Sequence, residues 1–214
     1  MLKYLPNGKL SRRYKRRMLA LAASVTLTGS FLAYCVHQFM VHDSYVFAYS
    51  STDVKDYEAL TTGYASEYGV SEYLPWLMSI MEVESGGSVD DVMQSSESLG
   101  LDPNSLDTDS SIQQGCSYFA QLLQKAKELG TDFDSVLQAY NYGSGYLDYV
   151  AAHGKVHTEA LAEQFAKENA NDKKCTDLNP VAIKSNGGWR YAYGNMFYVT
   201  LVHNAYTKLY GNIE

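Results

Sequence analysis

Cysteine is scarce in this chain, and its scarcity excludes a fold held together by disulfides. Only three cysteines occur among the 214 residues, namely Cys35, Cys116 and Cys175. Three cysteines do not make a disulfide framework. The simplest interpretation of Cys116 is a small buried helix residue, and its pairing with Cys175 is left open. A chain of this length can instead bury a core of one ordinary domain and carry an appendage.

Motifs of several common enzyme classes are also missing. The sequence contains no G-x-x-x-x-G-K-[ST] phosphate loop and no G-x-S-x-G nucleophile elbow. His153 and His157 have the four-residue spacing that can place two metal ligands on one helix face. However, Gly154 interrupts that face, and no third ligand is nearby in the sequence. We therefore expect no metal site and no cofactor.

Acidic residues are absent from the first 17 positions, and charged residues of either sign are absent from the next 24. Residues 1–17 carry seven Lys and Arg residues, whereas residues 18–41 contain no Asp, Glu, Lys or Arg. Such an apolar run is long enough to span a bilayer and longer than the core of a cleavable signal peptide. A basic cluster on its N-terminal side is typical of a cytoplasmic flank.

These patterns predict a basic cytoplasmic tail over residues 1–17 and a single transmembrane helix over residues 18–41. A linker over 42–55 and a domain over 56–214 would follow outside the cell membrane, and secretion after signal cleavage is the alternative. The basic tail could also be a nucleic-acid arm, but the apolar run after it argues against that partner. From residue 18 onward the chain holds 24 acidic and ten basic residues, a net charge of −14.

The outer part of the chain also lacks the alternation that is typical of a β-sandwich or barrel. Its apolar residues recur with helical spacing, so we predict a mainly α-helical domain. The predicted helices are 56–68, 71–85, 110–129, 133–142, 145–153, 158–170 and 195–210. We expect irregular segments over 86–109, with room for a small hairpin, and over 170–190. Ser110 and Gln113 match a capping box at the start of the third helix.

Glu84 differs from the other acids because of its position on its helix. Leu77, Ile80 and Met81 precede it by seven, four and three residues, so it shares their apolar face, whereas Glu82 points elsewhere. A carboxyl group at the edge of an apolar stripe loses hydration, which raises its pKa and suits a general acid. The alternative is a glutamate at a helix end that is hydrogen-bonded to a nearby backbone or hydroxyl group.

Three short motifs follow one another in order at compatible spacings. They are Glu84-Ser85-Gly86, Met-Gln-Ser-Ser-Glu-Ser over residues 93–98, and Gln-Ala-Tyr-Asn-Tyr-Gly over residues 138–143. Together they resemble the goose-type lysozyme and lytic transglycosylase superfamily, and most closely the CwlT-type lysozyme-like domain of Gram-positive cell-wall enzymes. The resemblance covers about residues 56–210 and includes, more weakly, the Tyr-Val pair at Tyr198.

The resemblance implies an α+β lysozyme-like fold that is mainly helical, with a small irregular or β segment beside the catalytic helix. Glu84 matches the catalytic glutamic acid of the family. The expected substrate-binding residues are Ser85, Gln94, Ser96, Tyr140, Asn141 and Tyr198. Amide side chains offer donors and acceptors to sugar hydroxyl and N-acetyl groups, and tyrosine offers a flat apolar face.

The function implied by the resemblance is cleavage of peptidoglycan glycan strands at the β-1,4 bond between N-acetylmuramic acid and N-acetylglucosamine. A hydrolase would need a second carboxylate to direct water, and Glu97 is the first candidate, with Asp90 and Asp91 next. A lytic transglycosylase needs no such base. A peptidoglycan-binding or assembly factor without activity is a third alternative. The expected partners are glycan strands, the membrane and other cell-envelope proteins.

Overall fold

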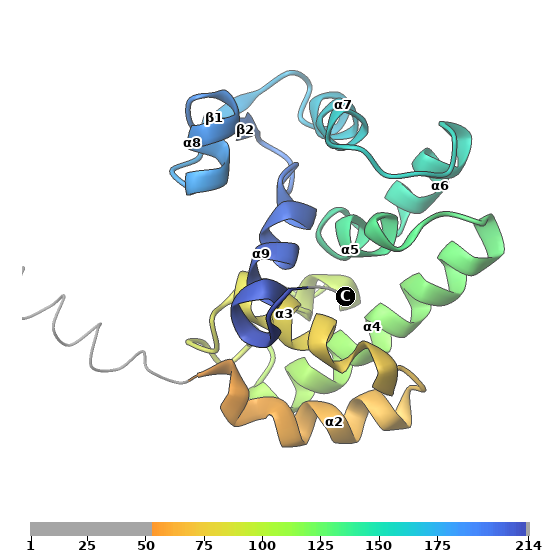
Figure 1. Cartoon of the computed structure of the whole chain (residues 1–214), viewed down its shortest axis with the longest axis vertical. Helices are drawn as coiled ribbons and strands as arrows, with labels where there is room; N and C mark the ends of the chain where they lie inside the picture. The colour runs from red at the N-terminus through yellow and green to blue at the C-terminus, as the bar shows by residue number, and fades with distance from the viewer. Residues whose placement is uncertain (1–52, 213–214) are drawn as a thin grey trace, which may run out of the picture. The chain divides into compact units, whose positions relative to one another are not determined.

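The computed structural model describes residues 53–212 of the chain. Within this part, eight α-helices and one antiparallel pair of short strands follow one another (Figure 1). The helices are α2 (Glu58–Glu67), α3 (Leu74–Glu84), α4 (Thr108–Leu129), α5 (Phe133–Tyr142), α6 (Gly145–Ala152), α7 (Glu159–Asn169), α8 (Pro180–Asn186) and α9 (Tyr198–Tyr210). The strands are β1 (Lys174–Thr176) and β2 (Trp189–Tyr191), and three 3₁₀ turns are η1 (Val54–Tyr57), η2 (Ser71–Tyr73) and η3 (Ser96–Leu99). The predicted mainly helical class is confirmed.

A proline and two glycines set the ends of α3. Pro75 lies in the first turn, where its missing N–H would have had no partner in the helix. At the other end, Gly86 and Gly87 have φ angles of 60° and 77°, which glycine adopts at little cost. The helix therefore stops directly after Glu84 and leaves that side chain at its C-terminal end.

The start of α4 differs from the prediction. The capping residue is Asp107, whose carboxylate accepts a hydrogen bond from the Ser110 N–H at 2.8 Å. The helix therefore begins at Thr108, two residues before the predicted start, and the capping box of Ser110 and Gln113 is wrong. An aspartate is as good a cap as a serine. Asp107 precedes Ser110 in the chain and caps the helix first.

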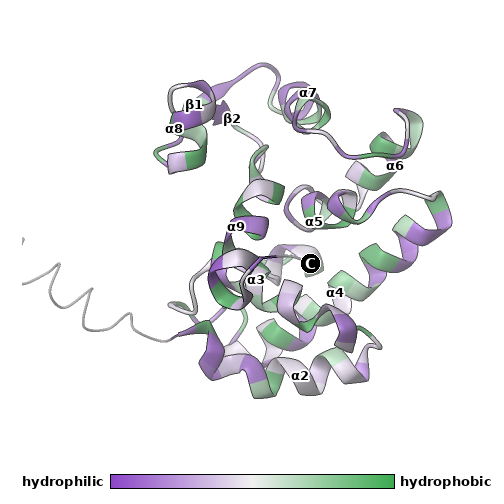
Figure 2. Cartoon of the chain, in the orientation of Figure 1, coloured by the Kyte–Doolittle hydropathy of each residue, from purple (hydrophilic) through white to green (hydrophobic). Residues whose placement is uncertain are grey.

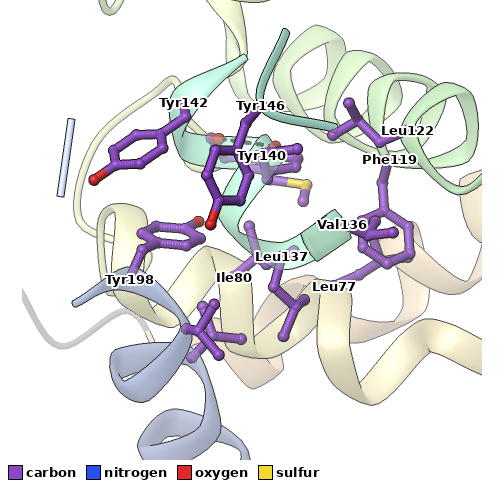
Figure 3. Close-up of a cluster of buried hydrophobic side chains, with 14 of the residues drawn as sticks. Leu77, Ile80, Phe119, Leu122, Val136, Leu137, Tyr140, Tyr142, Tyr146 and Tyr198 are labelled. Carbon is purple, nitrogen blue, oxygen red and sulfur yellow. Dashed lines mark hydrogen bonds between the residues drawn. The ribbon is translucent and has the colours of Figure 1, made fainter. Parts of the chain in front are cut away.

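The core forms where α3, α4, α5 and α9 meet. Helix α3 packs along α9, and α5 packs against α4, α6 and α9. Leu77, Phe119 and Leu137, from three of these helices, are fully buried there (Figure 3). Helix α4 carries hydrophobic and hydrophilic residues in turn along its length (Figure 2), as expected for a helix with one face toward the core. The arrangement brings the end of α3 close to the ends of α5 and α9.

The small β segment lies in a different place from the predicted one. Residues 170–190, predicted as a polar loop, contain β1, α8 and the start of β2. In the hairpin, Lys174 is paired to Tyr191 and Thr176 to Trp189. Residues 86–107 beside α3 contain η3 and no strand in the structure. Strands of three residues are too short to give a readable alternation, so the sequence pattern could not separate this hairpin from a loop.

The predictions for the tail, the transmembrane helix and nearly all of the linker fall on residues outside the described part. Among residues 53–212, no helix is long and apolar enough to cross a membrane. Cys116 and Cys175 form no disulfide in the described part of the chain, and Cys116 is fully buried in α4. Its predicted role as a small buried helix residue is confirmed.

Candidate active site

A cleft of about 540 Å³ opens beside the C-terminal end of α3. Four parts of the chain form its walls together with Glu84. They are the segment 94–98, Tyr118 of α4, residues 140–143 at the end of α5, and residues 192–194 after β2. Five of the eight predicted site residues line it, namely Glu84, Gln94, Glu97, Tyr140 and Asn141.

Glu84 is half-buried at this cleft and has an unusual acidity. Burial, the largest influence, raises the pKa of Glu84 to about 7, and the charges of Glu97 and Asp91 add to the rise. Tyr198 opposes it, because its hydroxyl donates a hydrogen bond to Glu84 Oε1 at 2.6 Å and favours the ionised form. Near neutral pH, a substantial fraction of the Glu84 side chains therefore carries a proton. Both conditions for a general acid, access to a cleft and an available proton, are present.

Glu82 has the different surroundings that helical phase predicted. Its carboxylate is paired with the Lys208 ammonium group on α9. Glu82 does not line the cleft. The two glutamates of α3 therefore point in different directions, and only Glu84 is available to a molecule in the cleft.

The acids between α3 and α4 fall into three environments. Glu97 is exposed in η3 and lines the cleft with Glu84. Asp90 is exposed but does not line the cleft. Asp91 is fully buried and accepts hydrogen bonds from the Ser95 N–H at 2.9 Å and from the Ser111 hydroxyl at 2.6 Å. Of the three acids considered as a base, the structure leaves only Glu97 at the cleft.

Asp91 organises the segment that carries Glu97. Burial alone would raise its pKa, but hydrogen bonds from Ser111, Ser96 and the Ser95 backbone outweigh burial and hold the pKa below its usual range. Asp91 thus stays ionised at neutral pH and ties the segment after α3 to the first turns of α4. These contacts assign Asp91 to the framework of the segment and leave it away from the cleft.

Gln94 lies on the cleft wall in a strained backbone conformation. Its φ angle is +47°, a region that costs a residue with a side chain about 1–3 kcal/mol. Its Nε2 donates to the Asp91 carbonyl at 2.8 Å and to Asn104 Oδ1 at 2.7 Å. The side chain is therefore held in one position on the cleft wall.

Ser85 and Ser96 do not line the cleft, although both were expected to bind substrate. The Ser85 hydroxyl donates to the Val92 carbonyl at 2.7 Å and accepts from the Gly87 N–H at 3.0 Å. Ser96 is fully buried and its hydroxyl donates to Asp91. Their hydroxyl groups are already used within the protein, so we place both serines in the framework of the site.

Tyr140, Asn141 and Tyr198 surround Glu84 with hydroxyl and amide groups that are also engaged. The Tyr140 hydroxyl donates to the Met93 carbonyl at 3.1 Å, and Asn141 Oδ1 accepts from the Asn195 N–H at 2.6 Å. Figure 3 shows Tyr140 and Tyr198 in the same buried cluster. Tyr198 is 2% exposed and does not line the cleft, and its hydroxyl contacts the acid.

The family model described as lysozyme-like matches residues 51–206. The chain belongs to the lysozyme-like family. It is 39% identical over 149 residues to YocA, an uncharacterized membrane protein of Bacillus subtilis (strain 168), covering 69% of this chain and 65% of YocA. It is 40% identical over 119 residues to CwlT of the same strain, a bifunctional muramidase/DL-endopeptidase, covering 55% of this chain and 35% of CwlT.

The chain is also similar to a solved structure. It is the crystal structure of a protein described as similar to a lipoprotein of the NLP/P60 family, from Staphylococcus aureus subsp. aureus Mu50. The TM-score is 0.72 at 53% sequence identity, covering 75% of this chain and 54% of that one. This chain therefore spans 65%, 35% and 54% of the lengths of YocA, CwlT and the solved protein. The lysozyme-like fold expected from the motifs is confirmed.

Tyr118 and Tyr193 are among the residues of the lysozyme-like cleft that sequence reasoning missed. Tyr118 of α4 lines the cleft and packs near Tyr140, with ring centroids 5.6 Å apart. Tyr193 also lines it, and its hydroxyl donates to the Tyr142 carbonyl at 2.9 Å. The aromatic stretch of residues 189–193 was a signal for Tyr193, but its place opposite α5 depends on a fold that periodicity alone does not give.

His153 and His157 have local partners in the structure. The His157 Nδ1 forms a hydrogen bond with the Tyr146 hydroxyl at 2.9 Å, and the His153 Nδ1–H donates to the Tyr149 carbonyl at 2.7 Å. In the described part of the lysozyme-like domain, no three His, Cys, Asp or Glu residues are grouped so that they could hold a metal ion.

Proposed function

We propose that this chain is an N-acetylmuramidase that cuts peptidoglycan between N-acetylmuramic acid and N-acetylglucosamine, with Glu84 as the general acid. The observation that carries the proposal is the state of Glu84. It is a half-buried carboxyl group at an open cleft, with its pKa raised to about 7 by burial. The relative CwlT is a bifunctional muramidase/DL-endopeptidase, and the lysozyme-like family supports glycan cleavage in general.

The proposed reaction begins with proton transfer. Protonated Glu84 would give its proton to the glycosidic oxygen, and the sugar would develop oxocarbenium character as that bond breaks. The Tyr198 hydroxyl, at 2.6 Å from Glu84 Oε1, would then stabilise the carboxylate that remains. The tyrosine faces and the fixed amide of Gln94 are suited to hold sugar rings and N-acetyl groups beside the acid.

Glu97 is the candidate base for a hydrolytic second step. It lines the same cleft as Glu84, and it is near enough for its charge to raise the Glu84 pKa. As a carboxylate it would direct a water molecule at the sugar. In the lytic transglycosylase alternative, a hydroxyl group of the substrate closes on the anomeric carbon instead, and Glu97 has no chemical step.

We further propose that residues 18–41 anchor the chain in the cell membrane, with the lysozyme-like domain on the wall side. The support is the uncharged run of 24 residues after a basic tail with seven Lys and Arg residues. An anchor would keep the domain close to the glycan strands. Secretion after cleavage remains the alternative, and other envelope proteins remain candidate partners.

Glu84→Gln tests the proposed activity. The purified full chain in mild detergent is incubated with peptidoglycan, and the released muropeptides are measured. We expect wild type to release them and Glu84→Gln to lose at least about 100-fold in rate, the size typical of a lost general acid. Glu82→Gln is the matched control on the same helix and should keep most of the rate. Equal release by wild type and Glu84→Gln would reject Glu84 as the acid.

The same digests separate the alternatives. Mass analysis of the new ends distinguishes reducing muramic acid from anhydromuramic acid, and therefore hydrolysis from transglycosylation. A hydrolase that uses Glu97 should lose most of its rate as Glu97→Gln, whereas a transglycosylase should not. Wall binding without any muropeptide release by wild type would instead support a non-catalytic binding or assembly factor.

A further inference from the structure

Gln138 is a polar residue whose side chain is fully buried in the protein interior. It lies in the middle of α5 with 0% exposure, and its Oε1 has no hydrogen-bond partner among the described residues. A buried amide without all its partners costs free energy. Its Nε2 donates to the Asn195 carbonyl at 2.9 Å. Gln138 does not line the cleft, so a ligand does not explain its burial. Its side-chain hydrogen bond to the Asn195 carbonyl is what its role must explain.

Asn141, one turn further along α5, also binds Asn195. Its Oδ1 accepts from the Asn195 N–H at 2.6 Å. Residues three apart on a helix lie on one face, so Gln138 engages the carbonyl of Asn195 while Asn141 engages its N–H. We call these two side chains the Asn195 clamp. The chain is tightly packed here, since a Cβ added to Gly194 would lie 2.6 Å from Asn141 Oδ1.

Asn195 is the point at which the loop after β2 turns into α9. Its Oδ1 accepts from the Phe197 N–H at 2.9 Å, and its carbonyl also accepts from the Tyr198 N–H at 3.1 Å. Tyr198 is the first residue of α9, and its hydroxyl donates to Glu84 Oε1 at 2.6 Å. A continuous series of hydrogen-bonded groups therefore leads from α5 through Asn195 to the acid.

We propose that Gln138, together with Asn141, is a positioning residue that fixes Asn195 and so holds the Tyr198 hydroxyl against the Glu84 carboxyl group. A hydrogen bond weakens steeply when its distance or angle changes. A small shift in the start of α9 would therefore loosen the contact with Glu84. The catalytic consequence rests on the proposed function, but the positioning itself does not.

The clamp has a measurable effect on Glu84. The groups that face this carboxyl are Tyr198 from α9, Tyr140 from α5, and Glu97 and Asp91 from the segment between α3 and α4. Of these, Tyr198 is the one whose hydrogen bond lowers the Glu84 pKa. Weakening that bond disfavours the ionised form, so loss of the clamp raises the Glu84 pKa further above its usual range.

Gln138→Met in the full chain tests this, because methionine has a similar size but lacks the donor and the unpaired oxygen. The Glu84 titration is followed by NMR of carboxyl-labelled glutamate and is assigned with Glu84→Gln. We expect the Gln138→Met midpoint to rise by about 0.5–1 pH unit, as for a weakened hydrogen bond to a charged group. Tyr198→Phe should raise it too. The double variant should rise no further than Tyr198→Phe alone, since both changes act on one bond.

Thr61→Val is the matched control. Thr61 is fully buried, and its hydroxyl donates to the Tyr57 carbonyl at 2.9 Å, away from the cleft. This variant should lower the melting temperature and leave the Glu84 midpoint in place. Asn141→Ala removes the other half of the clamp and should raise the midpoint, which gives a second test if Gln138→Met does not fold.

Three results would overturn the clamp. They are an unchanged midpoint in Gln138→Met, an equal rise in Thr61→Val, and rises of Gln138→Met and Tyr198→Phe that add in full. Peptidoglycan release is measured on the same samples. A raised Glu84 midpoint in Gln138→Met, together with no muropeptide release by wild type, would reject the proposed function and support the clamp. Release by wild type with an unmoved Gln138→Met midpoint would reject the clamp alone.

Discussion

Asp91 and Asp90 are adjacent in the sequence and differ in almost every physical respect. Asp91 is fully buried and receives hydrogen bonds from Ser95, Ser96 and Ser111, whereas Asp90 is exposed. A buried carboxylate is tolerated only where such donors replace its lost water. The segment that carries Gln94 and Glu97 therefore depends on one aspartate that does not touch the cleft.

Asp91→Asn should destabilise the protein by about 1–3 kcal/mol at neutral pH, because an amide replaces a charged acceptor of several donors. The pKa of Asp91 is lowered in the folded state, so its contribution is complete above the ordinary aspartate pKa and is lost as the pH falls below it. Urea unfolding should show a wide gap between wild type and Asp91→Asn at pH 7 and a narrower one below about pH 4.

Asp90→Asn is the control for the preceding comparison. It makes the same chemical change one residue away, at an exposed side chain, so its unfolding midpoint should match that of wild type. Equal losses in both variants, or a gap for Asp91→Asn that widens in acid, would contradict the framework role of Asp91.

Sequence reasoning separated the acids of α3 more successfully than it assigned the polar residues around them. Helical phase distinguished Glu84 from Glu82 because both are on one regular helix, where direction follows from position. Ser85 and Ser96 are in irregular backbone, where a hydroxyl faces whichever acceptor the local turns bring near it. Their contacts with Val92 and Asp91 could therefore not be read from spacing.

At the scale of elements, α4 and the segment after α3 approach one another unusually closely. Gly115 makes this possible, since a Cβ at that position would lie 2.9 Å from Met93 Cβ. Met93 is fully buried, and its carbonyl accepts from the Tyr140 hydroxyl. The glycine in the middle of a helix therefore has a packing purpose, despite its low helix propensity.

Gly115→Ala should destabilise the protein by about 1–3 kcal/mol, because overpacking the contact with Met93 outweighs the better helix propensity of alanine. Gly63→Ala on α2 is the matched control, since a Cβ there would meet no atom within 4 Å. It should leave stability unchanged or raise it by up to about 1 kcal/mol. Thermal and urea unfolding check both, and a Gly115→Ala protein as stable as wild type would refute the packing role.

Long helices were predictable here and short elements were not. The helices α4, α5 and α9 have several apolar residues in phase and clear stops at Gly130, Gly143 and Gly211. The strands β1 and β2 have three residues each, and they pair with each other across the intervening helix α8. The wall of the cleft at Tyr193 follows from this small hairpin, so the sequence pattern could not place it opposite α5.

The whole molecule has an uneven distribution of charge. From residue 18 to the end, the sequence has 24 acidic and ten basic residues, a net charge of −14. The described site adds to this, because Glu84 and Glu97 line the cleft and Asp91 lies behind it. If peptidoglycan is the substrate, as proposed, the carboxylates on its peptides are also negative, so long-range attraction would not bring the domain and the wall together. Recognition would have to come from short-range contacts with neutral sugars.

This charge predicts an unusual salt dependence for the proposed reaction. The Debye length falls from about 30 Å at 0.01 M salt to about 8 Å at 0.15 M, so added salt should screen the repulsion. Initial muropeptide release should therefore rise by about twofold or more over this range. With peptidoglycan whose carboxylates have been amidated, the same range should change the rate little. A rate that falls steadily with salt would instead mean that the basic groups guide the wall into the cleft.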